Sequence, residues 1–279
     1  PPMLVALTCI GAKIPMIVAP AMDKNMANSK IIKQNLKEVK KFATVLDPIM
    51  IEGKAKLPSK FRITAEACKI AGKNDLKKNK ILVIGGGSSE EIDEVRVITN
   101  KSTGKMAKHL AEAAFNMGAD VELWMGETTE VVGEWISQQK FNSVEDLSKK
   151  IKKLSKYDAI LVPAALSDFV PVKTKGKISS QKVPEIKLKK AKKVIELLRK
   201  KHKGKLCAFK LESGLTDNKL IEKGKTLLKN ADIVVANHSE VLGDENTKLA
   251  IITKKGNKWI EDTKINASKQ ILKEIVKKI

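Results

Sequence analysis

Residues 80–107 read KILVIGGGSSEEIDEVRVITNKSTGKMA. The run 81–84 is short, apolar and mostly β-branched, which predicts a strand covered on both faces in a parallel sheet. Three glycines follow at 85–87, and glycine permits positive φ and a close approach of backbone N–H groups to a ligand. A second polar loop, ITNKSTGKM, then opens a helix. A strand, a glycine turn and a helix start within one crossover predict an anion site for phosphates.

The helix that begins after Gly104 is indicated by apolar residues at helical spacing, Met106, Leu110, Ala113 and Met117. Ser102 and Thr103 precede it, where hydroxyl groups cap a helix or bind a phosphate. The dinucleotide pattern G-x-G-x-x-G is only half met, because Glu90 stands in place of the third glycine. A plain strand-to-helix turn therefore stays open as an alternative.

Strand-like and helix-like segments alternate beyond this stretch. We expect strands at 120–124, 159–163, 206–209 and 233–236, helices at 104–118, 143–155, 190–201 and 216–229, then a hairpin of 249–253 with 258–262 and a last helix at 266–278. This order predicts an α/β fold with a doubly wound, mostly parallel, Rossmann-like sheet. Ligands of such sheets bind outside the carboxyl ends of the strands, so the polar motifs at those ends should share one crevice.

The chain is expected to contain two parts and a linker. The first sixty-odd residues hold one strand-like run, 14–19, and one helical stretch, 29–41, which is too little to close a sheet. Residues 73–79 are polar and lysine-rich and predict a linker. We therefore expect 1–72 to be the carboxyl-terminal remnant of an α/β domain, truncated at its amino terminus, and 80–279 to be a second domain.

The net charge of +22 suggests nucleic-acid binding as one function, but only three of the 54 basic residues are arginine and only ten residues are aromatic. Arginine forks and aromatic platforms are what phosphate and base recognition favour, so most of the charge is interpreted as a solvated lysine surface. Arg96 stands out in such a chain, because an arginine supplies a planar bidentate cation. His109, His202 and His238 are interpreted as surface residues.

Three widely spaced cysteines argue against a disulfide framework or a zinc cluster and favour a reducing cytoplasm. No apolar segment is as long as a membrane span, so no membrane association is expected.

Several motifs together are specific to one family. GGGSSEEIDEVRVITNKSTGKM at 85–106 is followed by PAALSDF at 163–169, GKI at 176–178, AFKLE at 208–212 and ADIVVAN at 231–237. Their order and spacing resemble the phosphopantothenate–cysteine ligase domain of the bifunctional coenzyme A biosynthesis flavoprotein. Upstream, APAMDKNM at 19–26 and EGKAKLP at 52–58 resemble the end of its partner, the phosphopantothenoylcysteine decarboxylase, in an archaeal-like form.

The resemblance implies an enzyme that joins 4′-phosphopantothenate to L-cysteine through an acyl-cytidylate, with CTP as the nucleotide and Mg²⁺ as the metal. It also implies an FMN-dependent decarboxylase partner, a homodimer formed through the ligase domain and a higher homo-oligomer when the flavin domain is intact. CTP and ATP cannot be separated from the sequence alone. Asp23 stands where the best-known form of the family has asparagine, and the family's cysteine-containing flap is replaced by 52–56, so no decarboxylase residue is carried over.

The resemblance also assigns site residues. Arg96, Asn100 and Lys177 match the family's catalytic positions, with Lys177 retained before Ile178 although Ser179 departs from the usual lysine. The nucleotide-binding positions are Gly86, Gly87, Ser102, Gly104, Lys105, Ala164, Asp168, Lys177, Phe209, Lys210 and Asn237. Asp168 is also the candidate metal ligand, since a carboxylate near nucleotide phosphates suits Mg²⁺.

Two other functions use parts of the same pattern. An NAD(P)-dependent oxidoreductase shares the sheet type and the glycine turn, but the third glycine is missing and Glu122, the only candidate acid on a second strand, is not at the expected place. A nucleic-acid-binding module would depend on charge alone.

Overall fold

Strand β5 (Lys80–Gly85) is a central strand of the main sheet, and its residues 81–85 are all buried. It pairs in parallel with β8 (Asp120–Met125) on one side and with β10 (Ala159–Val162) on the other. The prediction of a strand covered on both faces is therefore confirmed. The computed structural model describes all residues except 1, 180–182, 184, 240–242 and 278–279.

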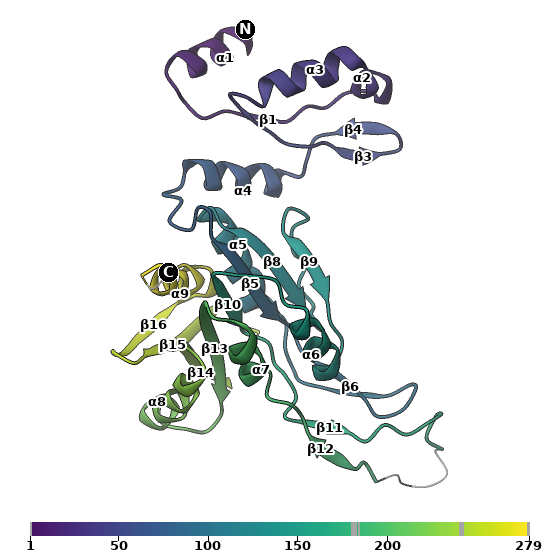
Figure 1. Cartoon of the computed structure of the whole chain (residues 1–279), viewed down its shortest axis with the longest axis vertical. Helices are drawn as coiled ribbons and strands as arrows, with labels where there is room; N and C mark the ends of the chain where they lie inside the picture. The colour runs from purple at the N-terminus through teal and green to yellow at the C-terminus, as the bar shows by residue number, and fades with distance from the viewer. Residues whose placement is uncertain (1, 180–182, 184, 240–242, 278–279) are drawn as a thin grey trace. The chain divides into compact units, whose positions relative to one another are not determined.

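The main sheet has eight strands in the order β16-β15-β14-β13-β10-β5-β8-β9 (Figure 1). Its other strands are β9 (Ser137–Lys140), β13 (Lys205–Glu212), β14 (Ile233–His238), β15 (Asn246–Thr253) and β16 (Gly256–Thr263). All neighbours from β9 to β14 are parallel, and β15 and β16 form the expected antiparallel hairpin. The chain winds outward from β5 through β8 to β9, then returns to β10 on the other side of β5. The order therefore reverses between β5 and β10, which confirms the doubly wound, Rossmann-like fold.

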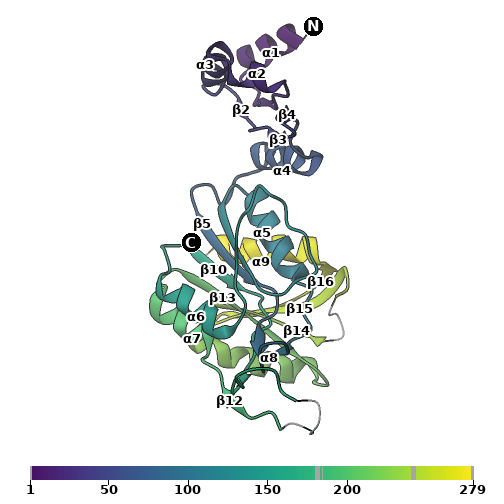
Figure 2. The same cartoon turned by 90° about the vertical axis from the view of Figure 1, so that its right-hand side faces the viewer.

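Helices cover both faces of this sheet (Figure 2). They are α5 (Lys105–Asn116), α6 (Val144–Lys152), α7 (Val194–Lys201), α8 (Asp217–Lys225) with the 3₁₀ turn η1 (Thr226–Lys229), and α9 (Lys264–Val276). Leu147 of α6 and Leu198 of α7 are fully buried against strand residues such as Leu82, in one continuous core. Helix α8 packs on the same face through Leu220, and α5 and α9 cover the opposite face (Figure 2).

Helix α7 begins at Val194 rather than at 190, because Lys190 is the last residue of a short strand. That strand, β12 (Leu188–Lys190), forms an antiparallel hairpin with β11 (Phe169–Pro171), and a second hairpin, β6 (Ser89–Glu91) with β7 (Val97–Thr99), lies between β5 and α5. Neither hairpin was predicted from the sequence, since strands of three residues carry no readable period. We call residues 89–99 together with the described residues of 169–190 the arm. Strands β6, β11 and β12 are close together in Figure 1, and the N–H of Thr174 donates to the carbonyl of Ile92 at 2.9 Å.

The chain divides into two compact units. Unit 1 comprises residues 1–74 with the short stretches 116–118 and 133–135, and unit 2 comprises the remainder. Within the expected linker 73–79, Leu76 is fully buried, and residues 75–79 belong to unit 2.

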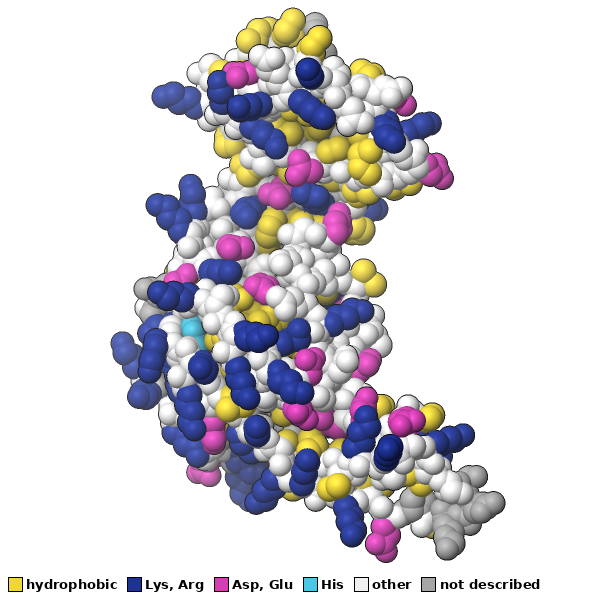
Figure 3. All heavy atoms as spheres, turned by 45° about the vertical axis from the view of Figure 1, so that its right-hand side comes forward, with side chains coloured by type: hydrophobic (Ala, Val, Ile, Leu, Met, Phe, Trp, Pro, Cys, Tyr) yellow, Lys and Arg dark blue, Asp and Glu magenta, His cyan; other side chains and the backbone are white. Residues whose placement is uncertain are grey.

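Unit 1 consists of short elements: α1 (Pro2–Gly11), β1 (Ile17–Val18), α2 (Lys24–Asn28), α3 (Lys30–Val39), β2 (Thr44–Val45), β3 (Ile49–Ile51), β4 (Lys54–Lys56) and α4 (Lys60–Ala71). Its strands form only two-stranded pairs. Among the described residues of 1–74, the buried hydrophobic side chains are Leu46, Ala55 and Ala65, and many large apolar ones are exposed (yellow in Figure 3). None of the helices that the structure describes is long and apolar enough to cross a membrane.

Candidate active site

The glycine turn after β5 connects the ends of three neighbouring strands. The N–H of Gly87 donates to the carbonyl of Glu127 at 2.8 Å, after β8, and the N–H of Ala165, after β10, donates to the carbonyl of Gly86 at 2.9 Å. Gly86 has φ of 76°, and a Cβ there would lie 2.7 Å from the Glu127 carbonyl oxygen. The turn therefore needs glycine to let backbones meet, and the Gly87 N–H is used within the protein. Nucleotide contacts of Gly86 and Gly87 stay predictions.

The start of α5 is fixed by another glycine and a threonine. Gly104 has φ of 80°, and a Cβ on it would lie 2.4 Å from Thr128 Oγ1. That hydroxyl donates to the carbonyl of Thr103 at 2.7 Å and accepts from the N–H of Glu130 at 3.0 Å. Thr103 Oγ1 in turn accepts from the N–H of Lys105 at 3.3 Å, as a helix-capping hydroxyl does.

A cavity of about 150 Å³ lies at this helix start, beside the ends of β10, β13 and β14. Six of the residues predicted to bind the nucleotide line it: Ser102, Gly104, Lys105, Ala164, Phe209 and Asn237. They belong to four separate segments of the sequence, and the parallel sheet brings these segments to one edge. Lys264 also lines the cavity. No sequence signal singled it out, because it follows the last strand and belongs to none of the recognised motifs.

Side chains on β13 alternate between the two faces of the sheet. Phe209 and Leu211 line the cavity, and Lys210 belongs to the other face, where it pairs with Glu212 at 2.8 Å. Glu212 also binds Lys223 of α8 at 2.9 Å. The predicted contact of Lys210 with phosphates therefore gains no support from this geometry.

Asn100 and Asp168 both belong to the surroundings of the segment that follows β10: Asn100 bonds Ala165 of this segment, and Asp168 is part of it. Asn100 Nδ2 donates to the carbonyl of Ala165 at 3.1 Å, which places its amide next to the cavity wall. Asp168 is largely exposed and pairs with Lys193 at 2.6 Å. Within the described part of the chain, no group of three or more acidic, histidine or cysteine side chains is arranged to hold a metal. A metal at Asp168 would have one protein carboxylate and would depend on phosphates for other ligands.

Arg96 and the segment carrying Lys177 meet on the arm, at the carboxylate of Asp93. Arg96 Nη1 binds Asp93 Oδ2 at 2.7 Å, and the N–H of Ile178 donates to the same oxygen at 3.1 Å. Arg96 Nη1 also donates to the Ile178 carbonyl at 3.2 Å. Burial acts to raise the pKa of Asp93, but hydrogen bonds from the N–H groups of Ile178, Val95 and Arg96 and from the Arg96 side chain outweigh it and lower this pKa to about 2.

Asp93 was not singled out from the sequence, because its importance comes from joining two segments over 80 residues apart. Lys177 itself is exposed. Neither Arg96 nor Lys177 is among the described residues that line the 150 Å³ cavity.

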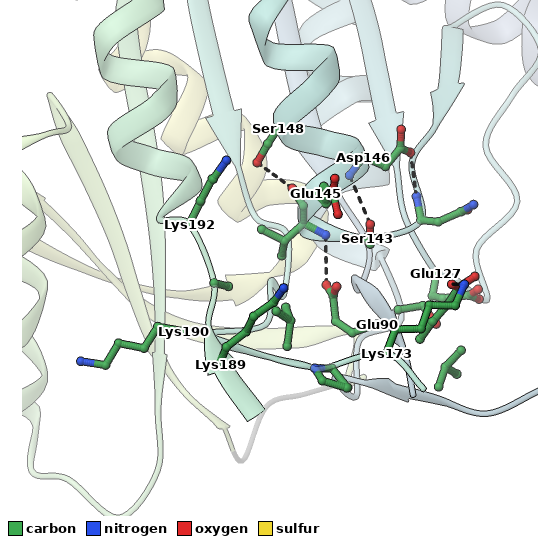
Figure 4. A pocket seen from close by; sticks show the side chains of 18 residues that line it. Glu90, Glu127, Ser143, Glu145, Asp146, Ser148, Lys173, Lys189, Lys190 and Lys192 are labelled. Carbon is green, nitrogen blue, oxygen red and sulfur yellow. Dashed lines mark hydrogen bonds and ion pairs between the residues drawn. The ribbon is translucent and has the colours of Figure 1, made fainter. Parts of the chain in front are cut away.

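A larger cavity of about 820 Å³ lies beside the start of α6 (Figure 4). Its charged side chains are largely engaged within the protein. Lys173 pairs with Glu91, and buried Glu90 accepts the N–H of Val144 at 3.0 Å, so this glutamate, at the position of the missing third glycine, stabilises the start of α6. Lys190 points away from these acids in Figure 4. None of the predicted site residues is among its described lining residues, so the smaller cavity is the better candidate.

The oxidoreductase alternative loses its acidic residue. The carboxylate of Glu122 accepts hydrogen bonds from Trp124 Nε1 and Gln139 Nε2, both at 2.8 Å, and from the Tyr157 hydroxyl at 2.6 Å. Burial and this hydrogen bond raise the pKa of Tyr157 to about 12. Glu122 is thus part of a structural hydrogen-bond network on the sheet and is not available to bind the ribose of a dinucleotide.

Comparison with known families gives two matches that together cover most of the chain. Residues 76–279 match the DNA/pantothenate metabolism flavoprotein C-terminal domain, and residues 2–72 match the flavoprotein family. Among solved structures, the DNA/pantothenate metabolism flavoprotein from Streptococcus pneumoniae is 26% identical with a TM-score of 0.65, over 71% of this chain and 98% of that one. The C-terminal domain of a coenzyme A biosynthesis bifunctional protein CoaBC is 29% identical with a TM-score of 0.60, over 74% and 97%.

Several curated relatives are named coenzyme A biosynthesis bifunctional protein CoaBC, and two of them are described here by their similarity to this chain. That of Methanocaldococcus jannaschii is 34% identical over 98% of this chain and 69% of its own length. That of Thermococcus kodakarensis is 32% identical over 90% of this chain and 64% of its own length. The chain thus spans about two thirds of the length of these relatives. The fold, the motif residues that line one cavity and these matches together show that the chain belongs to the family of coenzyme A biosynthesis bifunctional proteins.

Proposed function

We propose that unit 2 ligates 4′-phosphopantothenate to L-cysteine with CTP as the energy source. One observation carries this proposal: six residues that the motifs assigned to the nucleotide line a single cavity at the end of a doubly wound sheet. This is the edge at which such sheets bind their ligands. The family to which the chain belongs supports a function in coenzyme A biosynthesis. The motif residues support the ligase reaction in particular.

The reaction has two halves. A carboxylate oxygen of 4′-phosphopantothenate attacks the α-phosphorus of CTP, the bond to the β-phosphate breaks, and pyrophosphate leaves. The amine of cysteine then attacks the acyl carbon, loses a proton and releases CMP, which forms the amide. Both halves create negative charge on oxygen, so the protein contributes chiefly by placing the reactants and stabilising that charge.

Asn100 is proposed to donate to the carbonyl oxygen of the acyl-cytidylate. One N–H of its amide is held by the Ala165 carbonyl at 3.1 Å, which fixes the plane of the amide and leaves its second N–H to donate. An amide donates without adding charge, and a preorganised donor needs little reorganisation as charge develops.

Arg96 and Lys177 are proposed to neutralise phosphate charge. Asp93 holds the Arg96 guanidinium in one orientation and fixes the backbone next to Lys177, so the two cations are positioned together. Asp168 fits Mg²⁺ as a single carboxylate ligand, with nucleotide phosphates completing the coordination. The metal would supply charge neutralisation at those phosphates.

We also propose that unit 2 forms a homodimer through the arm. Val95, Val97, Phe169, Val172 and Leu188 of the arm are exposed to between 51% and 66%. Such a concentration of apolar surface on a projecting hairpin pair is typical of a protein interface. Sedimentation equilibrium of the chain and of a Val97→Lys, Phe169→Lys variant tests this; a dimer that survives both charges contradicts the interface.

Unit 1 is proposed to contribute to an FMN-dependent decarboxylase in the whole protein, with assembly into a higher oligomer. Among the described residues of this unit, the buried hydrophobic side chains are Leu46, Ala55 and Ala65. The cavity beside Met22 and Asp23 is lined otherwise by alanine, leucine and lysine residues.

Pyrophosphate release tests the ligase. The purified chain should release pyrophosphate when mixed with 4′-phosphopantothenate and CTP, and should form phosphopantothenoylcysteine after cysteine is added. ATP in place of CTP measures base preference, and omission of 4′-phosphopantothenate is the control. A folded preparation that releases no pyrophosphate with either nucleotide contradicts the proposal, and a shift of the unfolding temperature by NAD(P) alone would favour the oxidoreductase.

A further inference from the structure

Ser88 follows the glycine turn and is completely buried. Its accessible fraction is 0%, and it lies between β5 and β6 without belonging to either strand. A serine hydroxyl both donates and accepts hydrogen bonds, so a buried serine is costly unless it has partners. Each polar atom of Ser88 has such a partner, and these partners belong to two other segments of the chain, 99–100 and 165–167.

The side chain of Ser88 binds the segment that follows β10. Its hydroxyl donates to Ser167 Oγ at 3.1 Å and accepts the N–H of Ser167 at 3.0 Å. Ser167 is itself only 9% exposed, so water has little access to its N–H in place of this hydroxyl. A buried N–H without a partner is costly, so the hydroxyl of Ser88 stabilises residue 167 in this position.

The backbone of Ser88 binds both of the other segments. Its N–H donates to the carbonyl of Ala165 at 3.1 Å, and its carbonyl accepts the hydroxyl of Thr99 at 2.9 Å. The N–H of Ala165 donates in turn to the carbonyl of Gly86 at 2.9 Å. Three segments that are far apart in the sequence are thus joined at one buried residue.

The side chain of Asn100 is bound to the same junction. The Ala165 carbonyl oxygen that accepts the N–H of Ser88 also accepts Asn100 Nδ2 at 3.1 Å. A carbonyl oxygen has two lone pairs, and these two hydrogen bonds use both. Asn100 also follows Thr99 directly, whose hydroxyl is bound to Ser88. Because Asn100 is exposed, hydrogen bonds rather than packing orient its amide.

The glycine turn lies in close contact with the segment that carries Asn100. A Cβ on Gly87 would lie 3.1 Å from the backbone carbonyl oxygen of Asn100 and 3.4 Å from Thr99 Oγ1. Closely packed groups transmit a displacement from one to the next. A shift of residue 88 should therefore move residues 99 and 100 as well.

We propose that Ser88 is a positioning residue that orients the side-chain amide of Asn100 through Ala165 and Thr99. The proposal rests on the proposed ligase function for the role of that amide, which is to donate to the carbonyl oxygen of the acyl-cytidylate. Ser88 is buried and does not touch the substrate in this assignment. Its effect on turnover passes through Asn100, because a small displacement of a preorganised donor reduces what that donor contributes.

Nitrogen-15 relaxation of the Asn100 side-chain amide tests the orientation in the full chain without substrates. The signals of this amide are those that disappear in Asn100→Ala. Its order parameter should be above about 0.6 in the original chain and below about 0.6 in Ser88→Ala. Ser148→Ala is the matched control, because Ser148 is 5% exposed and its hydroxyl donates to the carbonyl of Val144 at 2.7 Å within α6. An amide that is already mobile in the original chain, or equal order parameters in the three proteins, would overturn the proposal.

Ligase kinetics separate positioning from a general loss of structure. Ser88→Ala should lower kcat about tenfold and leave the KM for CTP within about twofold, because Ser88 is not among the described residues that line the nucleotide cavity. Ser167→Ala should lower kcat less than about threefold, because the N–H of Ser167 keeps its bond to Ser88 Oγ. In an Asn100→Ala background, Ser88→Ala should cause no further loss of kcat, since its effect passes through Asn100. Equal fractional losses in the two backgrounds would show a structural role alone and overturn the proposal.

A second variant keeps the test decisive if Ser88→Ala does not fold by circular dichroism. Thr99→Val then replaces it, because residue 99 is exposed and the change removes the hydroxyl that is bound to the Ser88 carbonyl. An unchanged order parameter of the Asn100 amide in Thr99→Val would overturn the proposal. If the original chain has no ligase activity, the proposed function fails, and the relaxation measurement alone decides whether Ser88 orients Asn100.

Discussion

Gly104→Ala perturbs the start of α5 in a way that the structure allows us to quantify. Two costs add. The residue has φ of 80°, and a non-glycine residue in this left-handed region costs about 1–2 kcal/mol. The new Cβ would also lie 2.4 Å from Thr128 Oγ1 and 3.0 Å from Thr128 Cβ, and overpacking of this kind costs about 1–3 kcal/mol.

Thr128 cannot simply rotate away. Its hydroxyl donates to the Thr103 carbonyl and accepts the Glu130 N–H, so any rotation breaks two hydrogen bonds. We therefore expect Gly104→Ala to lower the free energy of unfolding by about 2–5 kcal/mol. For a unit of this size, each kcal/mol shifts the unfolding temperature by about 2–4 °C, which gives a drop of roughly 4–20 °C.

A matched control separates the two costs. Gly214 has φ of 65°, and no atom lies within 4 Å of the place that a Cβ on it would take, so Gly214→Ala bears the backbone cost alone. Thermal unfolding by circular dichroism should show a loss of about 1–2 kcal/mol for Gly214→Ala. The double variant Gly104→Ala, Thr128→Ala should lose less unfolding free energy than the two single variants lose together, because the shorter side chain at 128 relieves the clash. If Gly104→Ala costs no more than Gly214→Ala, the steric reasoning is refuted.

The other predictions concern charge and the two units. Lys177→Gln should slow turnover about a hundredfold, by analogy with the loss of one oxyanion-type donor. Lys175→Gln, on the same exposed segment, is the control. Near-normal turnover of Lys177→Gln would contradict the role assigned to Lys177. Asn100→Asp should weaken retention of the acyl-cytidylate, because a carboxylate faces an oxygen that gains negative charge, and mass spectrometry of the bound species without cysteine measures it; undiminished retention contradicts the assignment. The pKa of Asp93 is lowered to about 2, so the stability that its carboxylate contributes is complete above the ordinary value of about 3.9 and is lost as the pH falls through about 2. The difference in unfolding free energy between the original chain and Asp93→Asn should accordingly be constant from neutral pH to about pH 5 and shrink below about pH 4, and a difference that grows in acid contradicts this sign. Residues 1–72 alone should not bind FMN, and a purified segment with flavin absorbance would overturn this.

The alternation of strands and helices in unit 2 could be predicted because it depends on local patterns. The strand at 81–84 has no polar side chain, and the helix after Gly104 repeats its apolar residues every three or four positions. Parallel strands joined by helices can wind in few ways, so the edge at which the motifs meet also followed from the sequence. The cavity lined by Ser102, Phe209 and Asn237 lies at that edge.

Some local features were beyond pattern reading. The arm is built from three-residue strands, which carry too few residues for a period to show, and α7 was predicted to begin too early for the same reason. His202 was expected at the surface but is buried, and burial lowers the pKa of its ring. Its ring nitrogen bonds the Lys205 carbonyl at 3.0 Å, a contact made where the chain turns into β13.

The sequence alone therefore determined the order of strands and helices, the doubly wound sheet and the set of motif residues at one edge, because periodicity and short crossovers restrict these features. Only the tertiary structure decided which side chains lie next to each other, in the cavity and elsewhere. It brought Lys264 beside Lys105 across more than 150 residues, turned Lys210 to the far face of β13, and joined Arg96 to Ile178 through Asp93. Such contacts depend on how elements pack in space, and the local pattern around each residue contains no record of a distant partner.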